Sequence, residues 1–175
     1  MYIGVVRTRN VHMPERGHAH DAGMDFYIPE FDEEFVKHFK SLSQNEGIDI
    51  NSERIHLDPG RGAMIPSGVK TEIPIGYMGI FLNKSGVATK KRVLVGAQVV
   101  DCGYDGEVHI NLHNVSGRPI EFKPGDKAVQ MVLVPVVSAT PIEVEEDSLY
   151  EGMRNDAIQL RAADGFGSTG ENKKY

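Results

Sequence analysis

Residues 95–108 hold the clearest candidate for a catalytic group. The apolar run VGAQVV leads into Asp101, the turn CGYDG follows, and a second strand begins after it. This order predicts a β-hairpin. A carboxylate at the end of a buried strand can be held in one direction, as a general base requires. The alternative is that Asp101 only caps the turn.

A second segment, NKSGVATKK at residues 83–91, combines groups that bind anions. Lys84, Ser85 and Gly86 place a cation, a hydroxyl and a residue that permits close backbone approach in consecutive positions. Such a run is typical of an anion nest, with a plain surface turn as the alternative. The spacing of a P-loop is absent, so a nucleotide-binding P-loop is excluded.

The tail RAADGFGSTG, residues 161–170, is unusual for a glycine-rich end. Its glycines alternate with an arginine, an aromatic ring and two hydroxyls. Arginine matches phosphate oxygens through two parallel hydrogen bonds, and a ring between glycines is free to cover a flat base. A disordered tail is the alternative. The candidate residues of this tail are Arg161, Phe166, Gly167, Ser168 and Thr169.

The elements that must position these groups are short strands. Runs such as YMGIFLN and EVHINLHNV are rich in β-branched and aromatic residues and are separated by Gly, Pro and Asp turns. Spacings of roughly ten residues favour an antiparallel sandwich or distorted barrel. The sequence therefore predicts an all-β fold.

One helix is expected between the predicted strand at residues 24–29 and the strands that follow from residue 54 onward. Asp32 is a good N-cap, and Phe31, Phe35, Phe39 and Leu42 fall on one stripe at helical spacing. This stripe indicates a helix that packs on a sheet.

Composition narrows the class of protein. With 175 residues the chain is expected to form one domain, and its net charge of −6 disfavours non-specific binding of nucleic acid. The single cysteine, Cys102, fits a reducing compartment. No signal peptide is visible, and the longest apolar stretch, residues 131–137, is too short to cross a membrane. A cytoplasmic protein without membrane or nucleic-acid partners is expected.

The order of these segments resembles the five motifs of the homotrimeric dUTPase family. DAGMDFYIP (residues 21–29) looks like the first motif and NKSGVA like the second. GAQVVDCGYDGEV is similar to the third, PGDKAVQMVL (residues 124–133) to the fourth and RAADGFGSTG to the fifth. Single motifs are weak signals, but five in order across residues 21–170 are specific.

The resemblance implies a jelly-roll-like distorted β-barrel with one inserted helix, assembling as a homotrimer with shared active sites. Residues 1–152 would form the β domain, and residues 153–175 a flexible C-terminal lid. The segment at about 31–52 resembles an insertion between motifs one and two. Its role stays open between a flanking structural element and a partner surface.

The implied activity is hydrolysis of dUTP to dUMP and pyrophosphate, which limits uracil in DNA and supplies dUMP for dTMP synthesis. A water activated by Asp101 would attack the α-phosphorus of a triphosphate that chelates Mg²⁺. Asp25 would act from the outer shell of the metal through water, or hold the cation of motif two. The residues implied in substrate binding are Lys84, Ser85, Gly86, Val95, Gln98, Val99, Val100, Tyr104, His109, Gln130, Arg161, Phe166, Gly167, Ser168 and Thr169.

These residues would have distinct roles. Lys84, Ser85 and Gln130 would contact phosphates, and the backbone of residues 95–100 would read uracil. Tyr104 would pack on the deoxyribose and exclude a 2′-hydroxyl. From the tail, Phe166 would cap the base, while the arginine and hydroxyls would reach the γ-phosphate.

The sequence also departs from the family pattern. Lys84 stands where arginine is common and lacks its planar fork. Asn83 replaces a proline, and Gln98 replaces a small residue beside the base, which affects the shape of the uracil pocket. Asp164 adds a negative charge to the tail.

Several other functions compete with this interpretation. A dCTP deaminase would need a glutamate near the position of Asn111, and a non-catalytic regulator would keep the trimer without turnover. A zinc site at His18, His20 and Asp21 lacks further ligands, so a solvated loop is preferred. A nucleophilic role for Cys102 is discounted because that turn position is usually held by a small residue.

Overall fold

The computed structural model describes residues 1–156, in which most of the regular secondary structure is β-strand, and this confirms the all-β prediction. The strands are β1 (Gly4–Arg7), β2 (Met24–Tyr27), β3 (Asp49–Ile50), β4 (Ile55–Leu57), β5 (Gly62–Pro66), β6 (Val69–Glu72), β7 (Tyr77–Asn83), β8 (Val93–Gly96), β9 (Val99–Val100), β10 (His109–Asn114), β11 (Ile120–Phe122) and β12 (Lys127–Pro135). The helices are α1 (Glu33–Ser41), α2 (Ser85–Lys91) and α3 (Glu151–Asn155), with 3-10 turns η1 (Ser43–Asn45) and η2 (Glu146–Ser148). The sequence analysis did not anticipate α2 and α3.

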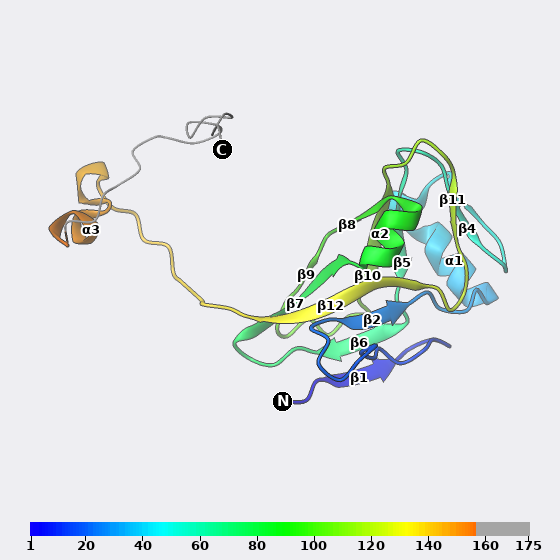
Figure 1. Ribbon diagram of the computed structural model, residues 1–175, viewed down its shortest axis with the longest axis horizontal. Coiled ribbons are helices and arrows are strands. Elements are labelled where there is room, and N and C mark those ends of the chain that lie inside the picture. Colours follow the sequence, from blue (N-terminus) through cyan, green and yellow to red (C-terminus); the bar gives the residue numbers. More distant parts are fainter. Residues whose placement is uncertain (157–175) are drawn as a thin grey trace, which may run out of the picture. The chain divides into compact units, whose positions relative to one another are not determined.

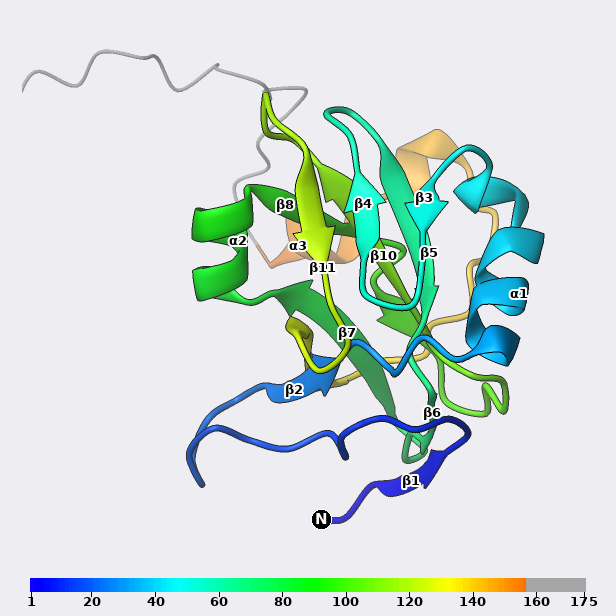
Figure 2. The same cartoon turned by 90° about the vertical axis from the view of Figure 1, so that its right-hand side faces the viewer.

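The strands form four small antiparallel sheets (Figures 1 and 2). The largest has the order β2-β12-β7-β9, and β5-β10-β8 and β11-β4-β3 have three strands each. The fourth pairs β1 with β6. Because neighbours such as β2 and β12 are far apart in sequence, this arrangement brings distant motifs onto one sheet.

Aromatic side chains fill much of the core. Phe26 of β2 and Phe81 of β7 are each 1% exposed and meet edge to face, with ring centroids 4.9 Å apart. Each such burial stabilises the fold by about 1.5–3 kcal/mol relative to an exposed ring. Strand alternation explains the pattern, since residues on either side along β7 are less buried.

Helix α1 forms as the sequence predicts. The Asp32 carboxylate accepts a hydrogen bond from the N–H of Phe35 at 2.7 Å, which caps the first turn. Phe35 and Phe39 are fully buried, and Phe31 stacks on Phe35 with centroids 5.0 Å apart. The inserted segment therefore packs its aromatic stripe into the core, as a structural element would.

Asn45 fastens the end of the inserted segment to β5. Its side-chain amide donates to the carbonyls of Phe39 at 2.9 Å and Met64 at 2.8 Å, and its side-chain oxygen accepts from the N–H of Met64 at 2.8 Å. Asn45 is only 3% exposed, so these bonds are shielded from water. The turn η1 is thereby fixed relative to β5.

The chain divides into two compact units, Met1–Ser138 and Ala139–Tyr175. All twelve strands lie in the first unit, and the described part of the second holds η2 and α3. The predicted limit at residue 152 falls inside the second unit. Within residues 1–156, no helix has the length and apolar character needed to cross a bilayer.

Candidate functional site

Residues 95–108 form a hairpin that differs from a simple two-stranded one. β8 pairs with β10, but β9 leaves that sheet and pairs with Gly79 and Ile80 of β7. The change of direction occurs at Ala97, whose φ of 45° lies in the left-handed region. A non-glycine residue is strained there by about 1–2 kcal/mol, and such strain gathers at functional sites.

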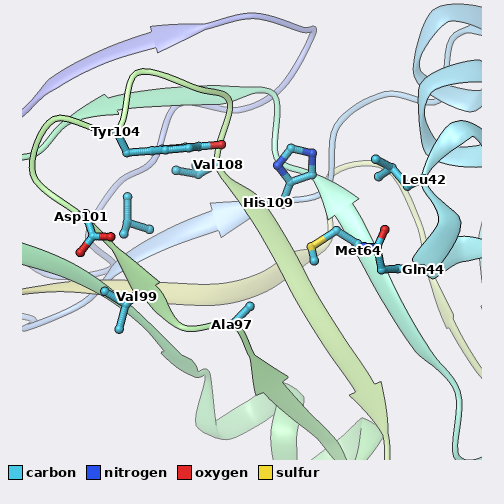
Figure 3. Close-up of a pocket in the computed structure, with 10 residues that line it drawn as sticks. Leu42, Gln44, Met64, Ala97, Val99, Asp101, Tyr104, Val108 and His109 are labelled. Carbon is cyan, nitrogen blue, oxygen red and sulfur yellow. The ribbon is translucent and has the colours of Figure 1, made fainter.

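This hairpin borders a pocket of about 460 Å³, a volume that suits a small ligand. Figure 3 shows its walls, and we call it the hairpin pocket. Its lining residues are Leu42, Gln44, Met64, Ala97, Val99, Val100, Asp101, Tyr104, Val108 and His109. Five of them, Val99, Val100, Asp101, Tyr104 and His109, were candidates from the sequence.

Asp101 and Tyr104 lie together at one side of the hairpin pocket (Figure 3). The Asp101 carbonyl accepts from the Tyr104 N–H at 3.2 Å, which closes the turn. The predicted burial of Asp101 is not found in the single chain, because its side chain is exposed. An exposed carboxylate beside an apolar pocket keeps the access to water that a general base needs.

The carbonyl of Glu107 orients two residues of the pocket. It accepts from the Tyr104 hydroxyl at 3.0 Å and lies 2.9 Å from Nδ1 of His109. A Cβ on Gly106 would lie 2.4 Å from the Tyr104 hydroxyl oxygen, so only glycine allows this position of the ring. The two aromatic side chains are therefore set by one short stretch of backbone.

Burial lowers the pKa of His109, although the Glu107 carbonyl and carboxylate oppose the shift. At neutral pH the ring is therefore uncharged, and its Nδ1 carries the proton that faces the carbonyl. The ring of His38 from α1 stacks on it, with centroids 6.1 Å apart. The helix α1 thus contacts a residue that lines the pocket.

Arg9 braces the hairpin from outside the pocket. Its guanidinium forms two hydrogen bonds with the Glu107 carboxylate, at 3.0 and 3.2 Å, and the N–H of Gly68 also donates to that carboxylate, at 2.6 Å. The same guanidinium lies 5.8 Å from the ring centroid of Phe35 and 3.8 Å from the carboxylate of Glu34. One arginine therefore contacts both the hairpin and the inserted helix.

A second polar group lies on the β2-β12-β7-β9 sheet. The carboxylate of Asp25 accepts from Nζ of Lys84 at 2.7 Å and from Nζ of Lys127 at 2.8 Å. The Asp25 side chain is 4% exposed, whereas the lysines are 31% and 41% exposed. We call these three residues the carboxylate–lysine cluster. Two cations around one anion leave a surplus positive charge near the surface, where it can attract a phosphate.

Asp25 stays ionised in this cluster. Burial alone would raise its pKa, but hydrogen bonds from Lys127 and Lys84 and their charges hold it below the usual value of 3.8. The hydrogen bond to Asp25 raises the pKa of Lys127 in turn. Of the two roles expected for Asp25, holding the cation of the second motif is the one that these contacts match.

Ser85, Gly86 and Gln130 lie next to the cluster. Lys84 is the N-cap of α2, so Ser85 and Gly86 open that helix, where a nest or turn had been expected. Gln130 of β12 is paired across the sheet with Asp25 and donates to the Asn83 carbonyl at 2.9 Å. A Cβ at Gly23 would lie 2.3 Å from the Gln130 side-chain oxygen, so glycine is required there.

Two expected base-contacting residues lie beside the hairpin pocket without lining it. The N–H of Val95 donates to the Asn83 side chain at 3.1 Å, and its carbonyl accepts from the Gln98 side chain at 3.3 Å. The Gln98 carbonyl accepts from the N–H of Phe81 at 2.8 Å. The tail candidates lie outside the described residues: Arg161, Phe166, Gly167, Ser168 and Thr169.

The sequence analysis missed the three lining residues that come from elsewhere in the chain. Leu42 and Gln44 belong to the inserted segment, and Met64 belongs to β5. The buried stripe of α1 was the only signal that this segment packs on the sheet, and it does not indicate a pocket. Ala97 and Val108 lay within the motif but were not singled out.

The residues considered for a zinc site, a nucleophilic cysteine and a deaminase make common structural contacts. Asp21 accepts from the N–H of His18 at 2.8 Å, and residues 1–156 contain no group of three or more metal-binding side chains. Cys102 is an exposed free thiol. Asn111, at the place of the deaminase glutamate, lies 2.7 Å from Nε2 of His113.

Comparison with known sequences identifies the family. The dUTPase family model matches residues 39–170, so its match begins inside α1, after the first motif-like segment. The chain is 37% identical over 132 residues to the deoxyuridine 5′-triphosphate nucleotidohydrolase of Eremothecium gossypii, covering 75% of this chain and 81% of that protein. It is 34% identical over 146 residues to the Arabidopsis thaliana protein of that name, covering 83% and 82%.

Solved structures agree on the fold. The dUTPase of phage phi11 of S. aureus, described with a structural Mg(II) ion, has a TM-score of 0.65 at 25% identity, covering 83% of this chain and 98% of that one. A mutant dUTPase of staphylococcal bacteriophage 80alpha, solved with dUpNHpp, has a TM-score of 0.69 at 24% identity, covering 97% and 98%. The family-model and sequence matches show that the chain belongs to the dUTPase family and hydrolyses dUTP.

Proposed function

We propose that the chain cleaves dUTP at the α-phosphorus, giving dUMP and pyrophosphate, with Asp101 as the general base. The observation that carries this proposal is the Asp101 carboxylate at the edge of a nucleoside-sized pocket, beside Tyr104. Asp101 takes a proton from water as the water oxygen bonds to the α-phosphorus. The bond from the α-phosphorus to the bridging oxygen then breaks, and pyrophosphate leaves.

The hairpin pocket holds the deoxyuridine in this scheme. Val99 and Val100 supply apolar walls, and Tyr104 packs on the sugar. The neutral ring of His109 adds a surface without a charge that would need solvation. Backbone groups of residues 95–100 that are free of sheet partners pair with uracil, and Gln98 shapes their loop through its bond to Val95. A mispaired base edge costs about 1–3 kcal/mol, which favours uracil.

The triphosphate lies at the carboxylate–lysine cluster. Lys84 donates to phosphate from a position fixed by Asp25, and the exposed hydroxyl of Ser85 is its neighbour. Gly86 leaves room for a phosphate because no atom within 4 Å would meet a Cβ there. Gln130 completes the group from β12.

The C-terminal tail closes over the bound nucleotide as a lid in this proposal. Residues 153–175 would form that lid, with Phe166 on the base and Arg161 at the γ-phosphate. Ser168 and Thr169 add hydroxyl donors, and Gly167 lets the backbone approach. This role is supported by the match of the family model, which extends to residue 170.

Magnesium would reach the site on the triphosphate. Both carboxylate oxygens of Asp25 are already bonded to lysines, so Asp25 does not fit as a direct ligand. Residues 1–156 offer no cluster of three metal-binding side chains either. Oxygen ligands suit Mg²⁺, and the phosphate oxygens of dUTP supply them, so Mg²⁺ is proposed as part of the substrate complex.

A homotrimer with shared sites explains how the two regions act on one nucleotide. The residues lining the hairpin pocket include none of Lys84, Ser85 or Gln130. We therefore infer that the pocket of one subunit faces the cluster of another. The net charge of −6 supports a small phosphorylated substrate rather than nucleic acid as the ligand.

The test of the proposed base is Asp101→Asn. This change keeps the size of the side chain but removes its basic oxygen. The expected kcat falls by about 10²–10⁴-fold, while dUMP binding measured by calorimetry stays near that of the wild type. Near-normal turnover in a pyrophosphate-release assay would show that another group activates the water.

A further inference from the structure

The hairpin pocket has a second wall that the hairpin does not supply. Leu42 and Gln44 come from the inserted segment and lie on one side of the pocket, whereas Asp101 and Tyr104 lie on the other (Figure 3). Leu42 ends α1 as its C-cap, and Gln44 is in η1. The segment between the first and second motif-like segments therefore borders the hairpin pocket.

This wall is held in place rather than loosely attached. The buried amide of Asn45, next in sequence to Gln44, hydrogen-bonds both to α1 and to Met64 of β5. The backbone of Gln44 is therefore fixed, while its side chain is exposed and forms no hydrogen bond with any of the residues that the structure describes. A polar group held at the edge of an apolar pocket is suited to fix the orientation of a ligand.

The part of the nucleotide that meets this wall follows from the proposed function, on which the inference rests. If the α-phosphorus is at Asp101 and the sugar at Tyr104, the nucleoside extends across the pocket from that side. The base is separated from the phosphates by the sugar. It therefore lies toward Leu42 and Gln44.

We propose that Leu42 and Gln44 are specificity-determining residues that contact the nucleobase. The carboxamide of Gln44 has both a donor and an acceptor, and it can turn to match the carbonyl or N–H groups of the uracil edge. Leu42 closes the pocket beside it and limits the size of a substituent on the base. The inserted segment thus sets how tightly and how selectively the base is held.

The first test replaces the Gln44 side chain. In Gln44→Ala the KM for dUTP should rise about 3- to 10-fold, because one hydrogen bond to the base is lost. The kcat should change little, because this contact is equally strong in the ground state and the transition state. The affinity for dUMP falls by the same factor, and that for inorganic triphosphate is unchanged. The matched control is Ser43→Ala, which changes an exposed neighbour outside the hairpin pocket and leaves KM unaltered.

The second test enlarges the pocket. Leu42→Ala increases the ratio of kcat/KM for dTTP to that for dUTP by about tenfold, because space for one methyl group is gained. Leu42→Met keeps the volume and leaves the ratio unchanged. Thermal unfolding of both variants identifies any general loss of folding.

The outcomes separate this inference from the proposed function. An unchanged KM in Gln44→Ala together with an unchanged nucleotide ratio in a folded Leu42→Ala would overturn the inference. An equal loss of dUMP and triphosphate affinity would overturn it as well. Both results would leave Asp101 as the base untouched, since that role is tested by the kcat of Asp101→Asn.

Discussion

The hairpin pocket and the carboxylate–lysine cluster solve two different physical problems. The pocket is mainly apolar, and its hairpin part comes from one continuous stretch of chain. The cluster buries a carboxylate, and it draws its three members from parts of the chain that are far apart in sequence: Asp25 and Lys127 are separated by 102 positions. Burying a charge requires partners at fixed positions, whereas an apolar wall requires only shape. The cluster therefore depends on the register of the whole sheet, and the pocket on a local turn.

The largest effect is expected when each region is disabled on a different chain. Asp101→Asn and Lys84→Met should each reduce kcat by about 10²-fold or more alone. If the regions of neighbouring subunits share a site, each mixed trimer of co-expressed variants should contain one intact site out of three. The measurement is the kcat of doubly tagged, co-purified oligomers.

Light scattering on those oligomers controls for assembly. If the mixed oligomers are no more active than either single variant alone, both regions act within one chain. That result would contradict sites shared between subunits.

The next largest effect concerns stability. Asp25→Asn should destabilise the fold by about 2 kcal/mol, because two lysines lose their shared anion, although their partial exposure softens the loss. The control is Glu121→Gln, which breaks the half-exposed ion pair with Arg54 and should cost less than about 1 kcal/mol. Urea unfolding measures the loss of unfolding free energy in both variants. Equal losses would mean that the buried carboxylate contributes no more to stability than the half-exposed one.

The difference in unfolding free energy between the wild type and Asp25→Asn should also depend on pH. Because the folded-state pKa of Asp25 lies below the usual 3.8, its contribution is present above that value and is lost as the pH falls through the folded-state pKa. The gap in unfolding free energy between wild type and Asp25→Asn should therefore narrow in acid below about pH 4. A constant gap would contradict an ionised Asp25.

A smaller effect is expected at the turn of the hairpin. In Gly106→Ala the new Cβ would meet the Tyr104 hydroxyl, so the ring must move off the sugar. Discrimination of dUTP against UTP should fall on the order of tenfold, as one steric contact is lost. Gly117→Ala, where no atom lies within 4 Å of the added carbon, is the matched control. If the variant still discriminates dUTP from UTP as well as the wild type does, Tyr104 does not exclude the 2′-hydroxyl.

The smallest effect is expected at His109. Its folded-state pKa lies below the usual 6.5, so the unfolded chain takes up a proton first as the pH falls. This group therefore stabilises the fold above pH 6.5, and its contribution is lost as the pH falls from 6.5 toward the folded-state pKa. His109→Gln should flatten that part of the stability profile, and an identical slope in the variant would argue against a neutral buried ring.

The sequence alone was sufficient for the features that are local. The N-cap of Asp32 and the spacing of Phe35 and Phe39 predict α1 because a helix repeats every few residues. The turn after Asp101 was predicted because its turn-forming residues are adjacent in sequence, whereas the substrate-binding residues around it were implied by the family resemblance. The family resemblance then added order to segments that were each ambiguous.

Features that depend on distant contacts were not predictable. The pairing of Asp25 with Lys127 requires β2 and β12 to be neighbours, which no local pattern indicates. The helix α2 was missed because its glycine and β-branched residues have low helix propensity. The roles of Leu42 and Gln44 emerge only when the inserted segment is packed on β5. The lid role of the tail stays a prediction.

Arg9 connects the N-terminal part of the chain to both sides of the hairpin pocket. Its guanidinium holds Glu107 beneath the hairpin and covers Phe35 beneath the inserted helix. A chimaera that exchanged residues 31–52 with another member of the family would therefore need to transfer the N-terminal ten residues as well. Exchanged alone, the new helix would leave this arginine without its aromatic surface, and the disturbance would spread to the turn that carries Asp101.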